Sequence, residues 1–373
     1  MNRRSIQVFE YASIIFVIIS SLLIVATFLL SMPLGIALFY FTDQGAEVAG
    51  RYAIDLPIYF LILFTVKIPW WVGLNELFLV VWVIFAVCFA VALKGPSKGV
   101  GRAVREAISG KPQGLLGNPL IALAIFGCFS LFLVNVIQGV QESRGIPTGD
   151  ISFPNEFEGF LSVSYASVIE EIGFRVTPVG LYLLAYVLVK RGTQMFKESF
   201  WKGAAVLALS MVHPESAKHR LGLKVFRDSG FRGITVGEWI LTLLTSLAFG
   251  LAHYFSGSGW EVGKISSASL VGFLMALGYL VYGVHFPILL HWFYNYYGYA
   301  FYLGGKVYGS AMYQLNQFLD PFTSIFGGIL IVFLVWTEYE RRRGQNAGME
   351  LSQIPVGEPV SSRNPDGSSF LEN

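Results

Sequence analysis

The chain has 373 residues, of which 54% are hydrophobic and only 13% are charged. Because soluble domains carry roughly 25% charged residues, this composition excludes a soluble globular protein and predicts an all-α, polytopic membrane protein. The formal net charge of +2 leaves no basic face for nucleic acid, so a nucleic-acid partner is excluded as well.

Apolar stretches long enough to cross a bilayer follow one another along the chain. About 20 apolar residues span a membrane as a helix, and this length predicts about eight transmembrane helices. They are expected at residues 12–41, 75–93, 119–140, 157–189, 239–256, 266–283, 286–304 and 322–337. Two shorter apolar runs, residues 56–66 and 203–212, are expected to be interfacial or re-entrant segments.

Positive charges indicate the side of the membrane on which each loop lies. With the N-terminus inside, the inner segments hold twenty of the 26 Lys and Arg residues, whereas the outer loops hold five. Cytoplasmic loops are enriched in Lys and Arg. We therefore expect an integral protein of the cell membrane whose two termini are both cytoplasmic.

Few ionisable side chains fall within the predicted spans, and they gather in three short motifs. Inserting one such group costs roughly 2.5–3.5 kcal/mol, so those that persist commonly line a cavity or have partners. The motif residues, including one neutral amide, are Glu170, Glu171, Arg175, His253, His291 and Asn295.

The first motif contains two adjacent carboxylates. On a helix, Glu171 and Arg175 are i and i+4 with the acid first, which is the favourable order for an ion pair. Glu170 lies about 100° further around the helix and has no local partner. A partly desolvated carboxylate beside a second one is suited to act as a general base. From this run alone, a charged clamp between two helices is an equally good interpretation.

The second and third motifs place a histidine four residues from a neighbour on the same helical face. Phe249 precedes His253, and His291 precedes Asn295. Two adjacent donors aimed at one point can form an oxyanion hole, although each pair taken singly also fits a hydrogen-bonded contact between helices.

Counting along the spans places Glu170 and His253 in the outer half of the membrane and His291 nearer its inner face. An error of several residues in the bounds of a span would bring all three to a common depth.

Taken together, Glu-Glu-x-x-x-Arg, Phe-x-x-x-His and His-x-x-x-Asn, in this order and on separate apolar segments, resemble the motifs of the CPBP family. These proteins are intramembrane endopeptidases related to the type II CAAX prenyl endopeptidase. The resemblance covers about residues 157–304. It implies that Glu170 and His253 activate a water molecule, and that His291 and Asn295 stabilise the oxyanion.

The resemblance also implies that Glu171 and Arg175 support the site, and that the substrate is a membrane-tethered peptide. A prenylated CAAX-type peptide is the form suggested by the named relatives. The interval between Arg175 and His253 is longer than we expect for this family, and the excess lies in an insertion at about residues 191–235.

The chain is therefore expected to have four parts. Membrane spans occupy residues 1–156, the CPBP-like catalytic core occupies residues 157–304, and the last span lies within residues 305–343. Residues 344–373 are polar and rich in Ser, Asn, Gly and Pro, which predicts a disordered cytoplasmic tail.

Other functions remain open at this stage. No cofactor is expected, but Glu170, His253 and His291 could instead hold zinc with a water in the fourth position, as in a zinc-dependent protease. The chain could also be a membrane scaffold or immunity protein that binds a peptide without cleaving it. A proton-coupled transporter is disfavoured because the sequence shows no internal repeat.

Overall fold

The computed structural model describes residues 3–53, 55–69, 71, 73–95, 98–196 and 199–352. This part of the chain is helical apart from one two-stranded sheet, so the predicted all-α class is confirmed. The chain divides into two units, Met1–Leu330 and Ile331–Asn373. The candidate site lies entirely within the first unit.

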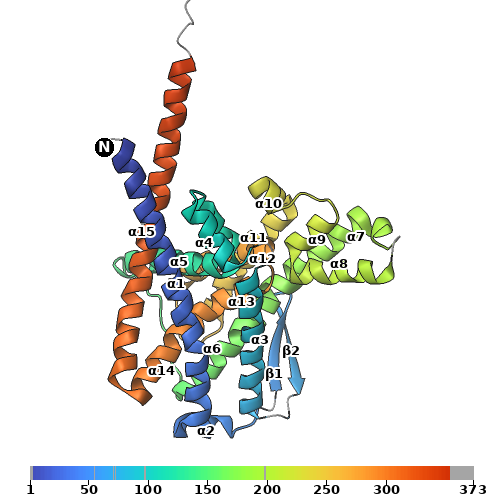
Figure 1. The fold of residues 1–373 in the computed structure, drawn as a ribbon. Coiled ribbons are helices and arrows are strands. Elements are labelled where there is room, and N and C mark those ends of the chain that lie inside the picture. The colour runs from blue at the N-terminus through green and yellow to red at the C-terminus, as the bar shows by residue number, and fades with distance from the viewer. Residues whose placement is uncertain are drawn as a thin grey trace, which may run out of the picture. The chain divides into compact units, whose positions relative to one another are not determined.

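The elements follow one another in the order drawn in Figure 1. They are α1 (Arg3–Phe41), α2 (Asp43–Ala49), β1 (Asp55–Phe60), β2 (Phe64–Pro69), α3 (Leu74–Lys94), α4 (Val100–Ile108), η1 (Pro112–Gly117), α5 (Pro119–Glu142), α6 (Glu156–Glu171), η2 (Ile172–Gly180), α7 (Leu181–Met195), α8 (Phe200–Val212), α9 (Pro214–Arg220), α10 (Phe226–Ser229), η3 (Gly230–Gly233), α11 (Val236–Phe255), α12 (Lys264–Tyr282), α13 (His285–Trp292), η4 (Phe293–Tyr297), α14 (Gly298–Tyr308) and α15 (Ser310–Ser352).

Within the described residues, seven helices are long and apolar enough to cross a membrane. They cover Tyr11–Phe41, Leu74–Lys94, Pro119–Glu142, Glu156–Gly192, Val236–Phe255, Lys264–Tyr282 and Ser310–Trp336. These helices coincide with seven of the predicted spans, the last of them beginning earlier than predicted. The length and apolar character of the helices support an integral membrane protein.

The eighth predicted span, residues 286–304, is helical but divided. α13 and α14 are joined by η4, a π-helix of five residues. The Glu156–Gly192 helix has a similar interruption, because the π-helix η2 lies between α6 and α7. Such π segments are rare and occur frequently at functional sites.

The two shorter apolar runs take different structures. Residues 203–212 belong to α8, whereas residues 56–66 form most of the antiparallel hairpin of β1 and β2. A strand pair was not among the elements predicted from the sequence. The hairpin packs against α6 and η2.

Aromatic packing fixes the position of α13 in the core. The Trp292 indole is fully buried and stacks on the Phe85 ring of α3. Phe28 of α1 packs edge-on against the same indole. Since α13 carries His291, these contacts hold one candidate site residue in place.

The insertion, residues 191–235, folds around a buried ion pair. The Lys218 ammonium contacts both carboxylate oxygens of Glu238, at 2.9 and 3.0 Å, and donates to the Gly233 carbonyl at 2.6 Å. The Val284 amide donates to the Val212 carbonyl at 2.8 Å. These bonds attach the insertion to α11 and to the start of α13.

The predicted tail is only partly described. α15 continues as a helix through residues 344–352, and residues 353–373 lie outside the described residues. The expected disorder of the tail stays a prediction.

Candidate active site

Glu170 and Glu171 lie in the last turn of α6, immediately before the π-helix η2. The Asn155 side chain caps the start of α6 by accepting from the amides of Phe157 and Glu158. Because neighbouring residues differ by about 100° around a helix, the two carboxylates meet different surroundings. The Glu171 side chain is fully buried, whereas the Glu170 side chain is 21% exposed.

Glu171 and Arg175 form the ion pair that the i, i+4 spacing predicts. Arg175 Nη1 lies 2.9 Å from Glu171 Oε1, and both side chains are fully buried. Arg175 Nη2 also donates to the Gly272 carbonyl of α12 at 3.2 Å. The guanidinium lies 4.4 Å from the centre of the Phe249 ring, within the range of a cation–π contact. Arg175 thereby links η2 to α11 and α12.

His291 extends this ion pair toward Glu170. Its Nδ1 lies 2.8 Å from Glu171 Oε1, and its Nε2 lies 3.7 Å from Glu170 Oε2. An ionised carboxylate only accepts hydrogen bonds, so Nδ1 carries a hydrogen and donates it to Glu171. This contact orients the imidazole so that Nε2 lies on the side of Glu170.

His253 is oriented by its own helix. Its Nδ1 lies 2.8 Å from the Phe249 carbonyl, which can only accept, so Nδ1 is the donor. In the neutral ring, Nε2 then keeps a lone pair that can accept a proton. The Phe249 ring contacts both imidazoles, with ring centres 4.6 Å from His253 and 5.8 Å from His291.

Asn295 lies in the π-helix η4 and faces α6. Its Nδ2 donates to the Val163 carbonyl at 3.3 Å and to Ser167 Oγ at 3.4 Å. Both distances are at the long end for hydrogen bonds. To serve as an oxyanion donor, the Asn295 amide has to release one of these two bonds.

One cavity of about 530 Å³ brings the predicted catalytic side chains together. Its lining includes Glu170, His253, His291 and Asn295, which come from α6, α11, α13 and η4. An adjoining cavity of about 780 Å³ shares the last three of these residues. Counting along the spans had placed His291 nearer the inner face than Glu170 and His253. In the structure all three side chains line the same cavity.

Glu171 and Arg175 do not line either cavity. They lie behind the wall and hold His291 and α12, which agrees with a supporting position for both.

Some residues that line the cavities were not predicted from the sequence. Pro57, Tyr59 and Thr65 of the hairpin line the first cavity, and so does Trp260. The Lys264 ammonium lies 3.7 Å from the centre of the Trp260 ring and lines the second cavity. An alternation of polar and apolar residues across residues 55–69 was the signal available for the hairpin.

Two further expectations concern metal ligands and the insertion. Among the described residues, no three His, Cys, Asp or Glu side chains are grouped so as to hold a metal ion. The alternative zinc ligands Glu170, His253 and His291 therefore share a cavity without forming a ready coordination site. Described residues of the insertion, residues 191–235, line neither cavity.

No protein-family model, curated protein or solved structure matches this chain.

Proposed function

We propose that the chain is an intramembrane endopeptidase that hydrolyses a peptide bond in a membrane-tethered substrate. The observation that carries this proposal is the convergence of Glu170, His253, His291 and Asn295 on one cavity from four helical segments. A carboxylate, two imidazoles and an amide supply the groups that activating a water and stabilising an oxyanion require.

In this mechanism Glu170 takes one proton of a water molecule, whose other hydrogen is hydrogen-bonded to His253 Nε2, as the water oxygen attacks the carbonyl carbon of the substrate. The resulting tetrahedral intermediate carries its negative charge on the former carbonyl oxygen. When it collapses, the C–N bond breaks and the proton passes to the departing amine.

His291 and Asn295 stabilise that oxyanion. Since Nδ1 of His291 donates to Glu171, its Nε2 can also donate only if the imidazole carries both hydrogens. Oxyanion donors of this kind contribute roughly 3–4 kcal/mol each to lowering the barrier.

The apolar part of the cavity suits a lipid-modified peptide. Ile62, Phe174 and Phe255 contribute apolar side chains to the same lining as Glu170. We therefore propose a prenylated CAAX-type peptide as the first substrate to test, with the protein in the cell membrane and both termini in the cytoplasm.

The test compares cleavage of such a peptide by the purified wild type and by Glu170→Gln, followed by mass spectrometry. Loss of a general base lowers rates by roughly 10²–10⁴-fold, so Glu170→Gln should show no cleavage above background. Glu261→Gln is the matched control, because Glu261 is exposed and lines neither cavity. Cleavage at equal rates by Glu170→Gln and the wild type would contradict the mechanism.

A chelator distinguishes the zinc-dependent version of the same protease. We expect cleavage to continue after incubation with a strong zinc chelator, because the water is activated by side chains. Loss of cleavage on chelation, followed by recovery on addition of zinc, would instead assign Glu170, His253 and His291 as ligands. A peptide that binds without being cleaved would favour the scaffold alternative.

A further inference from the structure

The hairpin of β1 and β2 has two chemically different faces. Antiparallel strands alternate their side chains between faces, and the register pairs Tyr59 with Thr65 and Pro57 with Lys67. Three of these residues, Pro57, Tyr59 and Thr65, line the cavity that contains Glu170. The opposite face is entirely apolar and consists of Leu56, Ile58, Phe60, Phe64, Val66 and Ile68.

The apolar face is uncovered along β2 and at Phe60, whereas Leu56 of β1 is buried. Phe64 and Val66 are 59% and 53% exposed, and each residue of β2 is exposed. In a helical membrane protein, an exposed apolar surface of this kind is suited to contact lipid. The hairpin therefore separates the candidate active site from lipid.

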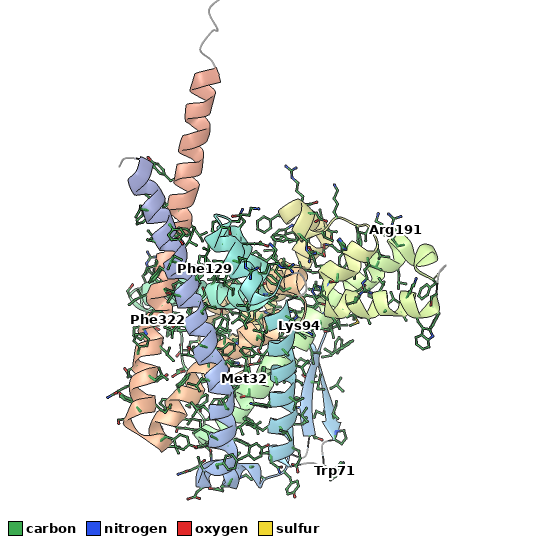
Figure 2. The ribbon with its side chains drawn as sticks, viewed as in Figure 1. Met32, Trp71, Lys94, Phe129, Arg191 and Phe322 are labelled. Carbon is green, nitrogen blue, oxygen red and sulfur yellow. The ribbon has the colours of Figure 1, made fainter. Side chains whose placement is uncertain are left out.

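The hairpin extends from the membrane interface toward the middle of a span. At its base, Trp71 is 82% exposed next to the start of α3 (Figure 2), as is typical of an interfacial aromatic residue. At its tip, the Leu61 amide donates to Thr177 Oγ1 at 2.9 Å and the Ile62 amide donates to the Gly173 carbonyl at 3.1 Å. Both acceptors lie in η2, within the Glu156–Gly192 span. Six strand residues cover roughly 20 Å, which fits this path.

One edge of the hairpin is closed by the protein. The Tyr165 hydroxyl of α6 donates to the Pro57 carbonyl at 2.8 Å, so this carbonyl faces α6 and away from β2. Proline has no amide hydrogen, so the Pro57–Lys67 pair cannot be a hydrogen-bonded pair of the ladder. Hydrogen-bonded and non-hydrogen-bonded pairs alternate along an antiparallel ladder, so Tyr59–Thr65, two pairs further on, is also non-hydrogen-bonded. The amides and carbonyls of Lys67 and Thr65 therefore point outward, along the free edge of β2.

That free edge has no partner in the described part of the chain. The described residues provide no hydrogen bond to the backbone groups of Thr65 or Lys67 outside the strand pair. Water can satisfy such groups at a soluble surface, but unpaired backbone groups facing lipid cost several kcal/mol each. An open strand edge at this depth is therefore a template for another extended chain.

We propose that the free edge of β2 binds the substrate, as an extended peptide segment that adds a third strand to the hairpin. The occupant is a peptide because it alone supplies alternating amides and carbonyls to Thr65 and Lys67, and the edge is continuous with the cavity through the Thr65 side chain. This inference rests on the proposed function and adds to it the way in which the substrate is held.

The added strand also explains how one substrate can have both an apolar anchor and a reacting bond. Alternate side chains of an extended peptide point to opposite faces of the sheet. One set would lie on the side of the Glu170 cavity, and the other set would lie with Phe64 and Val66 on the lipid side. A prenyl group on a residue of the second set can then stay in the bilayer while the neighbouring peptide bond enters the cavity.

The first test measures equilibrium binding to Glu170→Gln in nanodiscs, which avoids cleavage. The probe is a fluorescent, farnesylated peptide ending in a CAAX sequence, in which each backbone amide is replaced in turn by an ester. Each ester removes one N–H donor and leaves the protein unaltered. Strand addition predicts that esters at every second position weaken binding by about tenfold, a cost of about 1.4 kcal/mol per lost bond, with little change at the positions between.

The second test alters the edge itself. Thr65→Pro removes the outward amide. Pro57, which pairs with Lys67 two positions along the ladder, shows that the hairpin accepts proline where the amide does not face the partner strand. We expect Thr65→Pro to weaken peptide binding by at least tenfold without lowering the unfolding temperature. Glu261→Gln, at an exposed position that lines neither cavity, should bind like the unsubstituted protein.

Three results would each overturn the strand-addition proposal: equal affinities for all the ester-substituted peptides (a flat profile), an affinity of Thr65→Pro equal to that of the unsubstituted protein, or no binding of any peptide. If the wild type cleaves the peptide and the profile is flat, the protease proposal stands and strand addition fails. If the alternating profile appears without cleavage by the wild type, the edge binds peptides and the protease proposal fails.

Discussion

Glu170 and Glu171 are neighbours in the chain, yet the structure gives the two carboxylates different tasks. Glu171 is fully buried between the Arg175 guanidinium and His291 Nδ1, at 2.9 and 2.8 Å. Among the described residues, the one ion-pair contact of Glu170 is with His291 Nε2, at 3.7 Å, and Glu170 Oε2 makes no hydrogen bond. The first carboxylate is a structural anion, and the second is left available for chemistry.

This division predicts different effects on stability. Removing one partner of a buried ion pair leaves an uncompensated charge and costs about 3–5 kcal/mol, so Glu171→Gln and Arg175→Met should both unfold at much lower temperature. Glu170→Gln removes no ion pair with a lysine or arginine and should unfold close to the wild type. Thermal unfolding in detergent measures all three, and a drop for Glu170→Gln as large as that for Arg175→Met would refute the division.

The sequence predicted some of these contacts and not others, for a physical reason. The Glu171–Arg175 pair follows from helical spacing because both groups lie on one continuous element. The bond between His291 and Glu171 joins residues 120 positions apart, and no local pattern encodes such a contact. The three sequence motifs predicted which residues lie at the cavity, whereas the hydrogen bonds among them could be seen only in the structure.

The hairpin shows a limit of length-based reasoning at the scale of an element. The chain is 54% hydrophobic. A prediction that only counts consecutive apolar residues therefore treats residues 56–66 as one short apolar run. The alternation of Pro57, Tyr59, Thr65 and Lys67 with apolar residues was present, but the turn between the strands, Leu61–Ile62–Leu63, is itself apolar. Without glycine or asparagine at the turn, the usual hairpin signal was missing.

Docking of the hairpin depends on one glycine of η2. A Cβ added to Gly173 would lie 2.5 Å from Tyr59 Cβ, closer than real side chains approach. Gly173→Ala should therefore displace the hairpin and cost about 1–3 kcal/mol, as overpacking usually does, with a matching loss of peptide cleavage. Gly192→Ala is the control, since nothing lies within 4 Å of its added Cβ. Equal unfolding temperatures and cleavage rates for the two variants would show that the hairpin does not need this close contact.

At the scale of the whole molecule, the positions of the long apolar helices were the most predictable feature. Length and apolar content alone identified the seven long helices, because the bilayer imposes a fixed thickness on each. The π-helices η2 and η4 were not predicted. η2 begins directly after Glu170 and Glu171, and η4 contains Asn295. A π turn alters which side chains share a face without changing the apolar composition, so a composition-based prediction cannot detect it.

Orientation in the membrane is the remaining property of the whole molecule that the charge pattern predicts. The Lys- and Arg-rich insertion should lie in the cytoplasm, and the loop after α5 should lie outside. A membrane-impermeant maleimide added to intact cells should therefore label Ser143→Cys, whereas Lys224→Cys should react only after the cells are permeabilised. Both positions are exposed, while the native Cys88 and Cys128 are buried, which keeps the background low. Labelling of Lys224→Cys in intact cells would reverse the orientation and place the basic insertion outside, against the charge rule on which the prediction rests.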